Sequence, residues 1–425
     1  MAAPERGGEP YAELVTIESL ASGGAGVAHL ADGMTVFVSR SAPGDRVRLR
    51  DVRRHRRHAE AQIAEVVEPG PARVSPPCNH FVSDGCGGCQ WQHLSAVAQQ
   101  DAKRRIVGDA LRRVGKLDIA DPELVPSPRA LQYRTTITLT VRWHGAHPLV
   151  GFHDGADPDR VFMLDSCSIA REELGALWSA IRPALTALPK GDDVRLKLRI
   201  LEGGSRHVMV DGGDGAWTGA ARLSQAAGPG VTIWWQPKGG ASRRMAGADA
   251  DPSSVAFEQV NAEVAALLRE AVIEAAAGGS PTRLLDLYAG SGDTAVPLAQ
   301  RGFDVAMVEM DTRSVRRAEA RAQAAGVSVR CIAGRVEDQL SKLLPADVVI
   351  VNPPRAGLSD VVTAHLRVSA PARLIYVSCD PATLARDLTR LRITAADLLS
   401  LRAYDMFPQT SHVEILLVAR AGGRA

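Results

Sequence analysis

Short alternating runs of apolar and polar residues fill the first part of the chain. Between residues 9 and 70, the stretches AELVTIESLA, GVAHLADGMTVFVS, DRVRLRDVRR and AEAQIAEVVEP are separated by glycine-rich turns. Alternation places successive side chains on opposite faces of a β-strand. Short, evenly spaced strands are typical of small barrels of the OB type. We therefore predict a β-barrel domain over residues 1–70, with arginines on the exposed face of the third stretch.

The middle of the chain, residues 71–250, mixes helical and strand-like patterns. After the linker PGPARVSPP, the segment AVAQQDAKRRIVGDALRRVGKL has the spacing of an amphipathic helix. Residues 131–235 are mainly strand-like, with another helix near EELGALWSAIRPALTAL. We predict a flexible loop over residues 238–254, KGGASRRMAGADADPSS, because it is rich in small and polar residues. This part of the chain is predicted to form a central α+β domain.

The pattern changes again near residue 255. The helical segment NAEVAALLREAVIEAA precedes RLLDLYAGSGDTAVPLAQ, and the strand-like stretches DVAMVEMD, VSVRCIA, DVVIVNPPR, RLIYVSCDP and HVEILLVAR alternate with helical ones. Strands that alternate with helices form a mostly parallel sheet covered on both faces. We predict a Rossmann-like α/β domain over residues 251–425.

Composition and charge indicate a compartment and a class of partner. The 425 residues contain no apolar run that approaches the roughly 20 residues of a membrane span. MAAPERGGEPYAEL lacks the apolar core of a signal peptide, so we expect a cytoplasmic protein that does not associate with a membrane.

The net charge of the chain is only +2, but its basic residues cluster. Clustered arginines are typical of proteins that bind a polyanion such as RNA, although a solvated surface gives the same pattern. The two clusters are Arg46, Arg48, Arg50, Arg53, Arg54, Arg56 and Arg57, and Lys103, Arg104, Arg105, Arg112, Arg113 and Lys116.

The stretch LLDLYAGSGDTAVPLA runs from an apolar strand through a glycine turn into a helix. Gly290 and Gly292 let the backbone approach a ligand, and the helix N-terminus offers free N–H groups. Glu309 ends the next strand, about 20 residues on, where an acid can bind a ribose diol. The pattern is not the G-x-G-x-x-G of dinucleotide folds and resembles the turn of class I S-adenosylmethionine (AdoMet) methyltransferases. A plain strand–helix–strand unit is the alternative.

Two further strand ends carry polar residues on the same predicted edge. In VVIVNPPRAGL, Asn352 follows the strand, and Arg355 stands where amino-group methyltransferases usually have an aromatic residue, which argues against that subclass. This stretch alone also fits an ordinary turn. In RLIYVSCDPATLARDL, Cys379 lies between a strand and a helix, where the helix dipole favours a thiolate. A lone cysteine is often only a buried small residue, which is how we interpret Cys331.

Glu414 lies inside the apolar stretch HVEILLVAR, where a carboxylate needs a task or a partner. It fits a general base, with a structural ion pair as the alternative. Carbon 5 of uracil takes a methyl group only after a thiolate adds to carbon 6, and a base must then remove the carbon 5 proton. One cysteine, one base and one AdoMet site would suffice, and the sequence offers one of each.

Four other cysteines predict a metal site. Cys78, Cys86 and Cys89 are joined by the distant Cys167, and four thiolates suit a [4Fe–4S] cluster or zinc. Disulfides are rare in the cytoplasm. Unliganded buried thiols are the alternative, but CGGC is too polar and glycine-rich for a core segment.

These motifs together resemble the RNA uracil-5-methyltransferase family over nearly the full chain. The resemblance rests on FEQVN, which contains Gln259, on the glycine turn, on Ser378-Cys379-Asp380 and on His412-Val413-Glu414. It implies that Cys379 is the nucleophile and Glu414 the base. It also implies an AdoMet site lined by Gln259, Tyr288, Gly290, Glu309 and Asn352. Many members carry aspartate where this chain has Asn352.

The same resemblance extends to the other two domains. The barrel is similar to a TRAM domain, an RNA-binding module. CGGCQWQH resembles the stretch by which several ribosomal-RNA members hold a [4Fe–4S] cluster, which favours iron–sulfur over zinc. The first cysteine gap here is seven residues where five is frequent.

The resemblance implies a uracil-5-methyltransferase that acts on 23S ribosomal RNA. The sequence predicts no obligate protein partner. One alternative is a tRNA uridine-5 methyltransferase, although tRNA-specific relatives generally lack the cysteines. The other is a catalytically silent RNA-binding assembly factor.

Overall fold

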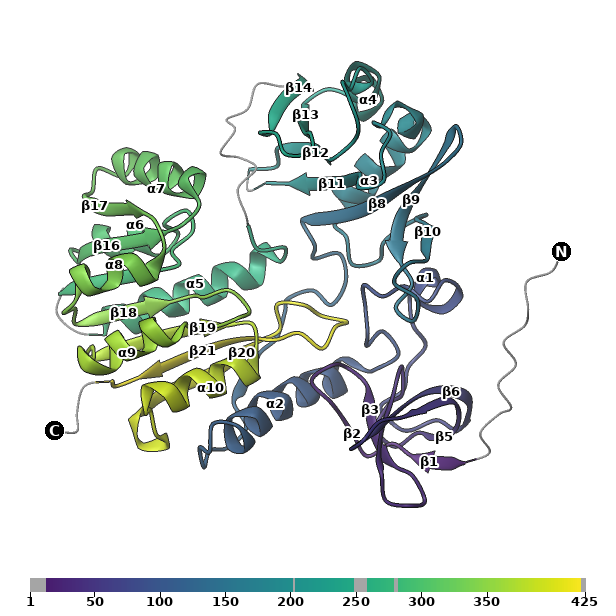
Figure 1. Ribbon diagram of the computed structural model, residues 1–425, viewed down its shortest axis with the longest axis horizontal. Helices are drawn as coiled ribbons and strands as arrows, with labels where there is room; N and C mark the ends of the chain where they lie inside the picture. Colours follow the sequence, from purple (N-terminus) through teal and green to yellow (C-terminus); the bar gives the residue numbers. More distant parts are fainter. Residues whose placement is uncertain (1–12, 202, 248–257, 279–281, 422–425) are drawn as a thin grey trace.

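The computed structural model describes residues 13–201, 203–247, 258–278 and 282–421, arranged around three β-sheets (Figure 1). The first sheet has the strand order β1-β5-β6-β4-β3-β2, antiparallel except between β4 and β6. Its strands are β1 (Leu14–Thr16), β2 (Ser19–Leu20), β3 (Gly26–His29), β4 (Thr35–Val38), β5 (Arg46–Arg54) and β6 (Ala59–Glu68). In β5, Val47 and Leu49 are buried while Arg46, Arg48 and Arg50 are exposed, as the alternation predicts.

The second sheet has the order β10-β9-β8-β11-β12-β13-β14. Its strands are β8 (Thr136–His144), β9 (His147–His153), β10 (Val161–Met163), β11 (Arg195–Ile200), β12 (Arg206–Asp211), β13 (Val231–Gln236) and β14 (Arg243–Gly247). Helices α3 (Glu172–Ile181) and α4 (Ala220–Ala227) pack on it. The predicted loop over 238–254 is wrong in its first half, because β14 pairs with β13 there. The rest of that loop lies outside the described residues.

The third sheet has the order β17-β16-β15-β18-β19-β21-β20-β7 and is mostly parallel, as predicted. Its strands are β7 (Glu123–Val125), β15 (Arg283–Leu287), β16 (Asp304–Glu309), β17 (Val329–Ala333), β18 (Val348–Val351), β19 (Arg373–Ser378), β20 (Leu398–Tyr404) and β21 (Glu414–Ala419). β21 runs antiparallel to both of its neighbours.

Helices cover both faces of the third sheet, and each face has its own apolar core. One face carries α5 (Ala262–Ala277), α6 (Ala295–Gln300) and α7 (Thr312–Ala324). The other carries α8 (Val336–Leu343), α9 (Asp360–Val368), α10 (Pro381–Leu391) and α2 (Ala96–Arg113). No helix in the described part of the chain is long and apolar enough to cross a membrane.

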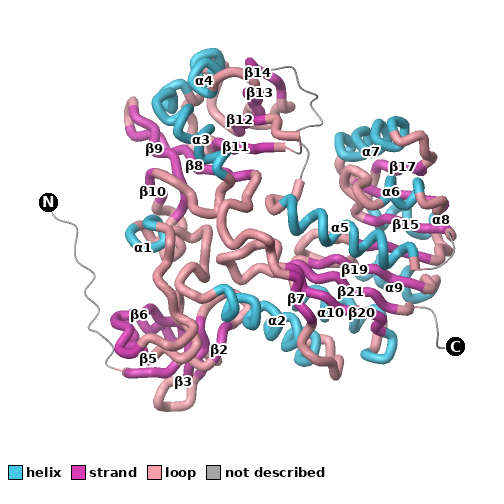
Figure 2. The backbone as a smooth tube through the Cα atoms, turned by 180° about the vertical axis from the view of Figure 1, so that it is seen from behind, coloured by secondary structure: helices cyan, strands magenta, loops and turns pink. Residues whose placement is uncertain are grey.

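The middle of the chain contributes to the third sheet. β7 pairs with β20, and α2 packs against α10, so both elements lie beside the C-terminal strands (Figure 2). The short helix α1 (Asn79–Ser83) follows the first sheet. The division at residues 1–70, 71–250 and 251–425 stays a prediction, but contacts between its second and third parts are extensive.

Candidate active site and cysteine centre

One edge of the third sheet gathers the polar residues that the sequence singles out. β15, β16, β18 and β19 are parallel neighbours, so their carboxyl ends meet at this edge. β21 runs the other way, and its first residue, Glu414, therefore lies at the same edge, next to the end of β19. Ligands of open α/β sheets bind beyond the carboxyl ends of the strands. This edge is the candidate active site.

The turn after β15 holds the acid at the end of β16. The backbone N–H of Gly290 donates to one carboxylate oxygen of Glu309 at 3.0 Å, and that of Asp311 donates to the other at 2.8 Å. Tyr288 and Gly290 have left-handed backbones, with φ of 61° and 55°. A Cβ atom on Gly290 would meet nothing within 4 Å. The turn therefore borders open space and presents a fixed carboxylate beside it.

The loop after β18 is anchored to α10. Thr383 donates its hydroxyl to the carbonyl of Arg355 at 3.1 Å, and the backbone N–H of Leu358 donates to the buried Asp387 at 2.7 Å. Asn352 and the Arg355 side chain remain exposed at the edge. The loop is thus rigid where it meets α10 and free to contact a ligand where it meets the edge.

Cys379 lies between β19 and α10, as predicted. Asp380 caps α10 by accepting the N–H of Thr383 at 2.7 Å, which fixes the turn that carries the cysteine. Burial, followed by the nearby Glu414 carboxylate, raises the pKa of the Cys379 thiol, while the Arg355 charge lowers it. The expected effect of the helix N-terminus on this thiol stays a prediction, and the net shift of its pKa is upward. Desolvation disfavours the charged thiolate, and the neighbouring negative charge adds to that effect.

Glu414 is buried, with 4% of its surface exposed. Burial raises the pKa of its carboxyl to about 7, against a smaller opposing effect of Arg355. Among the described residues, none forms an ion pair or hydrogen bond with this carboxylate, so the structural ion pair considered above does not form there. A carboxylate without a partner and with a pKa near neutrality is suited to remove a proton.

The FEQVN segment connects the sheets, but only part of it is described, because Phe257 lies outside the described residues. Glu258 pairs with Arg317 of α7 at 3.1 Å and with Arg199 of β11 at 3.5 Å. Asn261 is fully buried and caps α5. The placement of Gln259 against a cofactor stays a prediction.

The four cysteines predicted to bind metal come together, and we call them the cysteine centre. Cys78, Cys89 and Cys167 share one apolar cluster with Phe81, Tyr133 and Ile169. Cys86 lies beside the end of β9, where it bridges to Asp154. A Cβ on Gly87 would lie 3.0 Å from the backbone of Gly155, so this close approach requires glycine.

Burial raises the pKa of the Cys86 thiol to about 11 and that of Cys89 to about 12, and neighbouring cysteines contribute to both shifts. In a tetrahedral zinc site the four sulfurs lie about 3.8 Å apart. In the described part of the chain, His55, His58 and Glu60 are the only group of three or more potential ligands whose atoms all lie within 4.8 Å. No three of the cysteine sulfurs therefore all lie within 4.8 Å of one another. His55, His58 and Glu60 lie among exposed arginines, whose charge opposes cation binding.

The two basic clusters differ in what their charges contact. In the second cluster, Lys103 is fully buried and pairs with Asp405 at 2.5 Å, and Arg112 pairs with Asp109 and Asp121. The Lys103 charge is therefore not available to RNA, and the prediction for it is wrong. Arg112 is partly exposed, and its role in RNA binding stays a prediction. In the first cluster, Arg53, Arg56 and Arg57 are exposed, and their side chains form no ion pair or hydrogen bond with a described residue.

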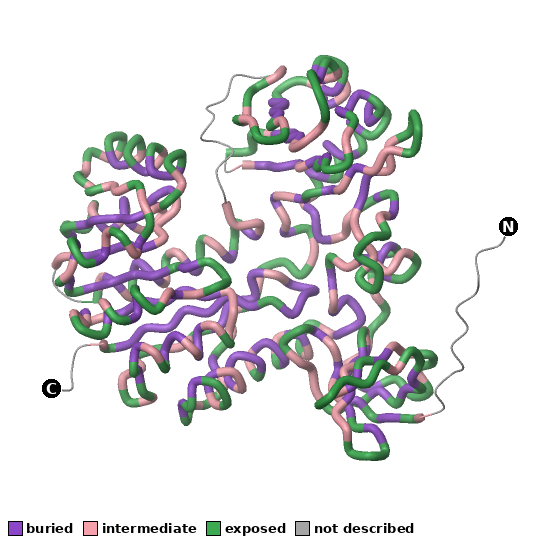
Figure 3. Tube along the Cα trace, viewed as in Figure 1, coloured by how far each residue is buried: buried purple, intermediate pink, exposed green. Residues whose placement is uncertain are grey.

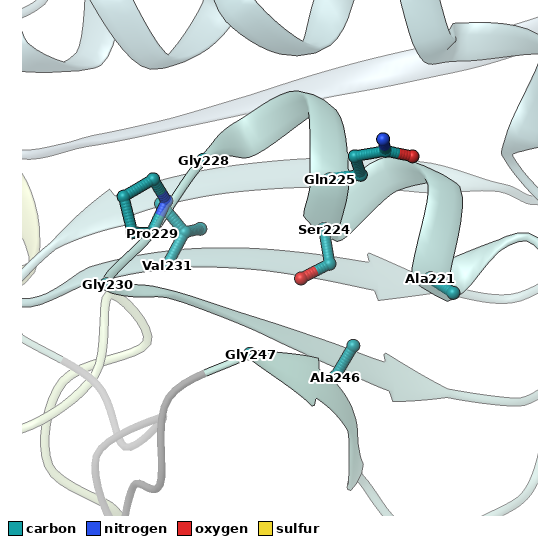
Figure 4. Close-up of a pocket in the computed structure, with 9 residues that line it drawn as sticks. All are labelled: Ala221, Ser224, Gln225, Gly228, Pro229, Gly230, Val231, Ala246 and Gly247. Carbon is teal, nitrogen blue, oxygen red and sulfur yellow. The ribbon is translucent and has the colours of Figure 1, made fainter.

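A groove of about 590 Å³ lies elsewhere, between α4, β13 and β14 (Figure 4). It is lined by small or uncharged residues: Ala221, Ser224, Gln225, Gly228, Pro229, Gly230, Val231, Ala246 and Gly247. Acid–base or nucleophilic chemistry needs titratable groups, and this lining has none. We therefore place the chemistry at the sheet edge and not in the groove.

The doubly wound sheet and its glycine-turn edge define a class I AdoMet-dependent methyltransferase. Comparisons with known proteins agree. Residues 325–420 match the tRNA (Uracil-5-)-methyltransferase family. The chain is also similar to the Pyrococcus abyssi tRNA (uracil-54, C5)-methyltransferase in complex with S-adenosyl-L-homocysteine. The TM-score is 0.73 at 24% identity, over 96% of this chain and 100% of that one, which shows a shared fold.

Sequence relatives are similar over almost the whole chain. The 23S rRNA (uracil(1939)-C(5))-methyltransferase RlmD of Aromatoleum aromaticum is 33% identical over 94% of this chain and 98% of its own. An uncharacterized RNA methyltransferase of Thermosynechococcus vestitus is 33% identical over 94% of this chain and 96% of its own. The chain therefore belongs to the RNA uracil-5-methyltransferase family.

Proposed function

We propose that this protein transfers a methyl group from AdoMet to carbon 5 of a uridine in 23S ribosomal RNA, in the cytoplasm. The observation that carries the proposal is the pair formed by Cys379 and the buried Glu414, which has no partner among the described residues, on the edge that holds the glycine turn. The names of several relatives support ribosomal RNA as the substrate.

The AdoMet site would lie beyond β15, β16 and β18. Glu309, fixed by two backbone N–H groups, would accept hydrogen bonds from the ribose hydroxyls. Tyr288 and Asn352 would line the site, and Gly290 leaves room for the cofactor because no described atom occupies the space in front of it. Gln259 would complete the site from the segment before α5. Bound AdoMet supplies an electrophilic methyl group.

The chain's own residues would divide the chemistry into two steps. The Cys379 thiolate would attack carbon 6 of the uracil, so that the electrons of the C5–C6 double bond form an enolate and carbon 5 becomes nucleophilic. After carbon 5 has taken the methyl group, Glu414 would remove its proton. The electron pair of the C–H bond restores the double bond and expels the Cys379 thiolate. Arg355, which lowers the pKa of Cys379, would favour the thiolate before attack.

We propose that the cysteine centre holds a [4Fe–4S] cluster. Support comes from four cysteines in one mostly buried place and from the resemblance of CGGCQWQH to the cluster-binding stretch of several ribosomal-RNA members. Cys78, Cys86, Cys89 and Cys167 would be the ligands. Such a cluster would tie the segment after the first sheet to the second sheet. Protein purified without air should then be brown and contain about four irons, whereas a colourless protein with one zinc would contradict the cluster.

RNA would be held by the first sheet and by the surface around the active-site edge. The arginine-bearing strand β5 and the exposed Arg53, Arg56 and Arg57 support an RNA-binding role of the TRAM type for this sheet. A target base inside a helix would have to leave its stack to reach Cys379, as in other enzymes that modify bases.

Purified protein tests the substrate. With AdoMet and a 23S ribosomal RNA fragment, mass spectrometry should find 5-methyluridine, and unmodified tRNA should be a much poorer substrate. Preferential methylation of tRNA would favour the function named in the matching family description. Tight AdoMet binding by calorimetry, with no methylation of either RNA, would point to a silent RNA-binding factor.

A further inference from the structure

The loop that leads to Glu414 is buried at the junction of the sheets. We call residues 405–413, between β20 and β21, the base loop. It projects from the sheet towards the middle of the molecule (Figure 1), and most of its residues are buried (Figure 3). A loop this deeply buried must satisfy its backbone polar groups with protein partners. Those partners come from distant parts of the chain.

Gln409 is the point where the base loop meets the cysteine segment. Its carbonyl accepts the backbone N–H groups of Gln90 at 3.1 Å and of Trp91 at 3.0 Å, the two residues directly after Cys89. The side chain of Gln99 forms two hydrogen bonds with Gln409. The side-chain oxygen of Gln99 accepts the backbone N–H of Gln409 at 2.9 Å, and the Gln99 NH₂ group donates to the side-chain oxygen of Gln409 at 3.0 Å. Gln409 has a left-handed backbone, with φ of 69°, so these bonds hold a conformation that the residue would rarely adopt alone.

Tyr133 gives the cysteine centre a second contact with the base loop. Its ring packs in the apolar cluster that contains Cys78 and Cys89, and its hydroxyl donates to the carbonyl of Pro408 at 3.0 Å. Further anchors come from outside the cysteine centre. Lys103 holds Asp405 and the carbonyl of Phe407, and Asn261 holds the carbonyl of Met406 at 3.2 Å.

We propose that the cysteine centre positions the catalytic base, with Gln409 and Tyr133 as the positioning residues that connect it to Glu414. This inference rests on the proposed function. Gln409 and Glu414 are five positions apart, and the carboxylate of Glu414 forms no hydrogen bond with a described residue. Its carboxylate is therefore held by the backbone that carries it. A base loop released from the cysteine segment would place Glu414 wrongly and leave Cys379 and the AdoMet site intact, because those belong to other strand ends.

This division predicts a specific defect. Attack by Cys379 and methylation of carbon 5 would proceed, but removal of the carbon 5 proton would be slow. The methylated RNA would then stay attached to Cys379. A general loss of folding would instead weaken AdoMet binding and adduct formation together.

Two variants test the proposal. Tyr133→Phe keeps the ring against the cysteines and removes only the bond to Pro408. Gln99→Met removes both bonds with Gln409 and also the bonds of Gln99 to the carbonyls of Trp91 and Leu94. Displacement of a catalytic group by about 1 Å costs on the order of 100-fold. We expect kcat to fall about 10-fold in Tyr133→Phe and about 100-fold in Gln99→Met. AdoMet affinity and iron content should remain unchanged, and a denaturant-resistant protein–RNA complex should accumulate.

Gln100→Met is the matched control, since Gln100 neighbours Gln99 on α2 and no described residue forms a hydrogen bond with its side chain. Hydrogen exchange gives a second readout. Amides of the base loop should exchange faster in Tyr133→Phe, while those of β15 and β16 should not change. Wild-type turnover in Tyr133→Phe, or slow turnover without the complex and without faster exchange, would overturn the proposal. If Gln99→Met does not fold, Tyr133→Phe alone decides. Absence of methylation by the wild-type protein would instead reject the proposed function.

Discussion

The active-site edge and the base loop differ in whether their polar side chains have hydrogen-bonding partners. At the edge, the side chains of Glu414 and Arg355 have no hydrogen-bonding partner among the described residues. A few residues away, Gln409 and Asp405 are buried and paired with Gln99 and Lys103. Unpaired groups are costly to bury but remain free to react, whereas paired groups are inert but hold their neighbours in place. The difference indicates that reactivity and positioning are assigned to adjacent but separate residues.

Removal of the nucleophile should have the largest effect. We expect Cys379→Ala to lower methylation by at least about 10⁴-fold, because carbon 5 is not activated without the thiolate. AdoMet binding, measured by calorimetry, should remain. Cys331→Ala is the control, since Cys331 lies within β17 and should lose little activity. Methylation by Cys379→Ala at a rate near that of wild type would reject the covalent mechanism.

Breaking one buried pair should reduce stability strongly. Lys103→Met leaves the buried Asp405 without its cation, and we expect the free energy of unfolding to fall by about 3–5 kcal/mol. Urea titration monitored by fluorescence measures this change. Arg105→Met removes an exposed charge from the same helix and should change stability by less than about 0.5 kcal/mol. Equal effects of the two substitutions would show that the pair does not anchor the base loop.

Replacement of the base should stabilise the protein above neutral pH. The pKa of Glu414 in the folded protein is about 7, above its usual 4.5, so the folded state binds this proton more tightly than the unfolded chain. That contribution to stability is complete below pH 4.5 and is lost as the pH rises through about 7. Glu414→Gln should therefore be more stable than wild type at pH 8, by up to about 3 kcal/mol, and nearly equal at pH 4.

Thermal unfolding at the two pH values measures this difference, with the exposed Glu270→Gln as the control. The same ionisation governs catalysis, so wild-type turnover should rise with pH through about 7 as Glu414 loses its proton. A stability gain that does not depend on pH would contradict the burial argument.

The smallest effect concerns RNA affinity. Alanine at Arg53, Arg56 and Arg57 together should weaken RNA binding about 10-fold at moderate salt and reduce the salt dependence by up to about one unit per lost phosphate contact. Filter binding at several salt concentrations measures both quantities, and AdoMet affinity should not change. Arg112→Ala offers a comparison, because its charge is already paired with aspartates. If the dependence of RNA affinity on salt concentration did not change, β5 and the turn after it would not be part of the RNA interface.

The candidate active site could be predicted from sequence because it depends on local patterns. Gly290, Glu309, Asn352 and Cys379 each lie at or just after the end of an apolar strand, and parallel strands bring their carboxyl ends together. Glu414 could be added to the candidate site because a carboxylate within an apolar strand is costly to bury unless it has a function or a partner. The direction of the Cys379 pKa could not be predicted in this way. It depends on burial and on Glu414, which becomes a neighbour only when β21 pairs with β19.

The positioning residues were not predictable from local patterns. Gln99 and Gln409 lie 310 positions apart, and neither belongs to a motif. Lys103 looked like part of an RNA-binding surface, because spacing within α2 does not reveal that Asp405 lies opposite. The pairing of β7 with β20 in the third sheet was also not predictable, since a strand of three residues has no recognisable pattern.

Trapping the covalent intermediate tests the proposed chemistry. Glu414→Gln protein would be mixed with AdoMet labelled in its methyl group and a 23S ribosomal RNA fragment, denatured, and separated by size. We predict a labelled protein–RNA complex joined through Cys379, because the methyl group has been transferred and the proton cannot leave. Release of free 5-methyluridine RNA by this variant at the wild-type rate, or the same complex in Cys379→Ala, would contradict the assigned roles.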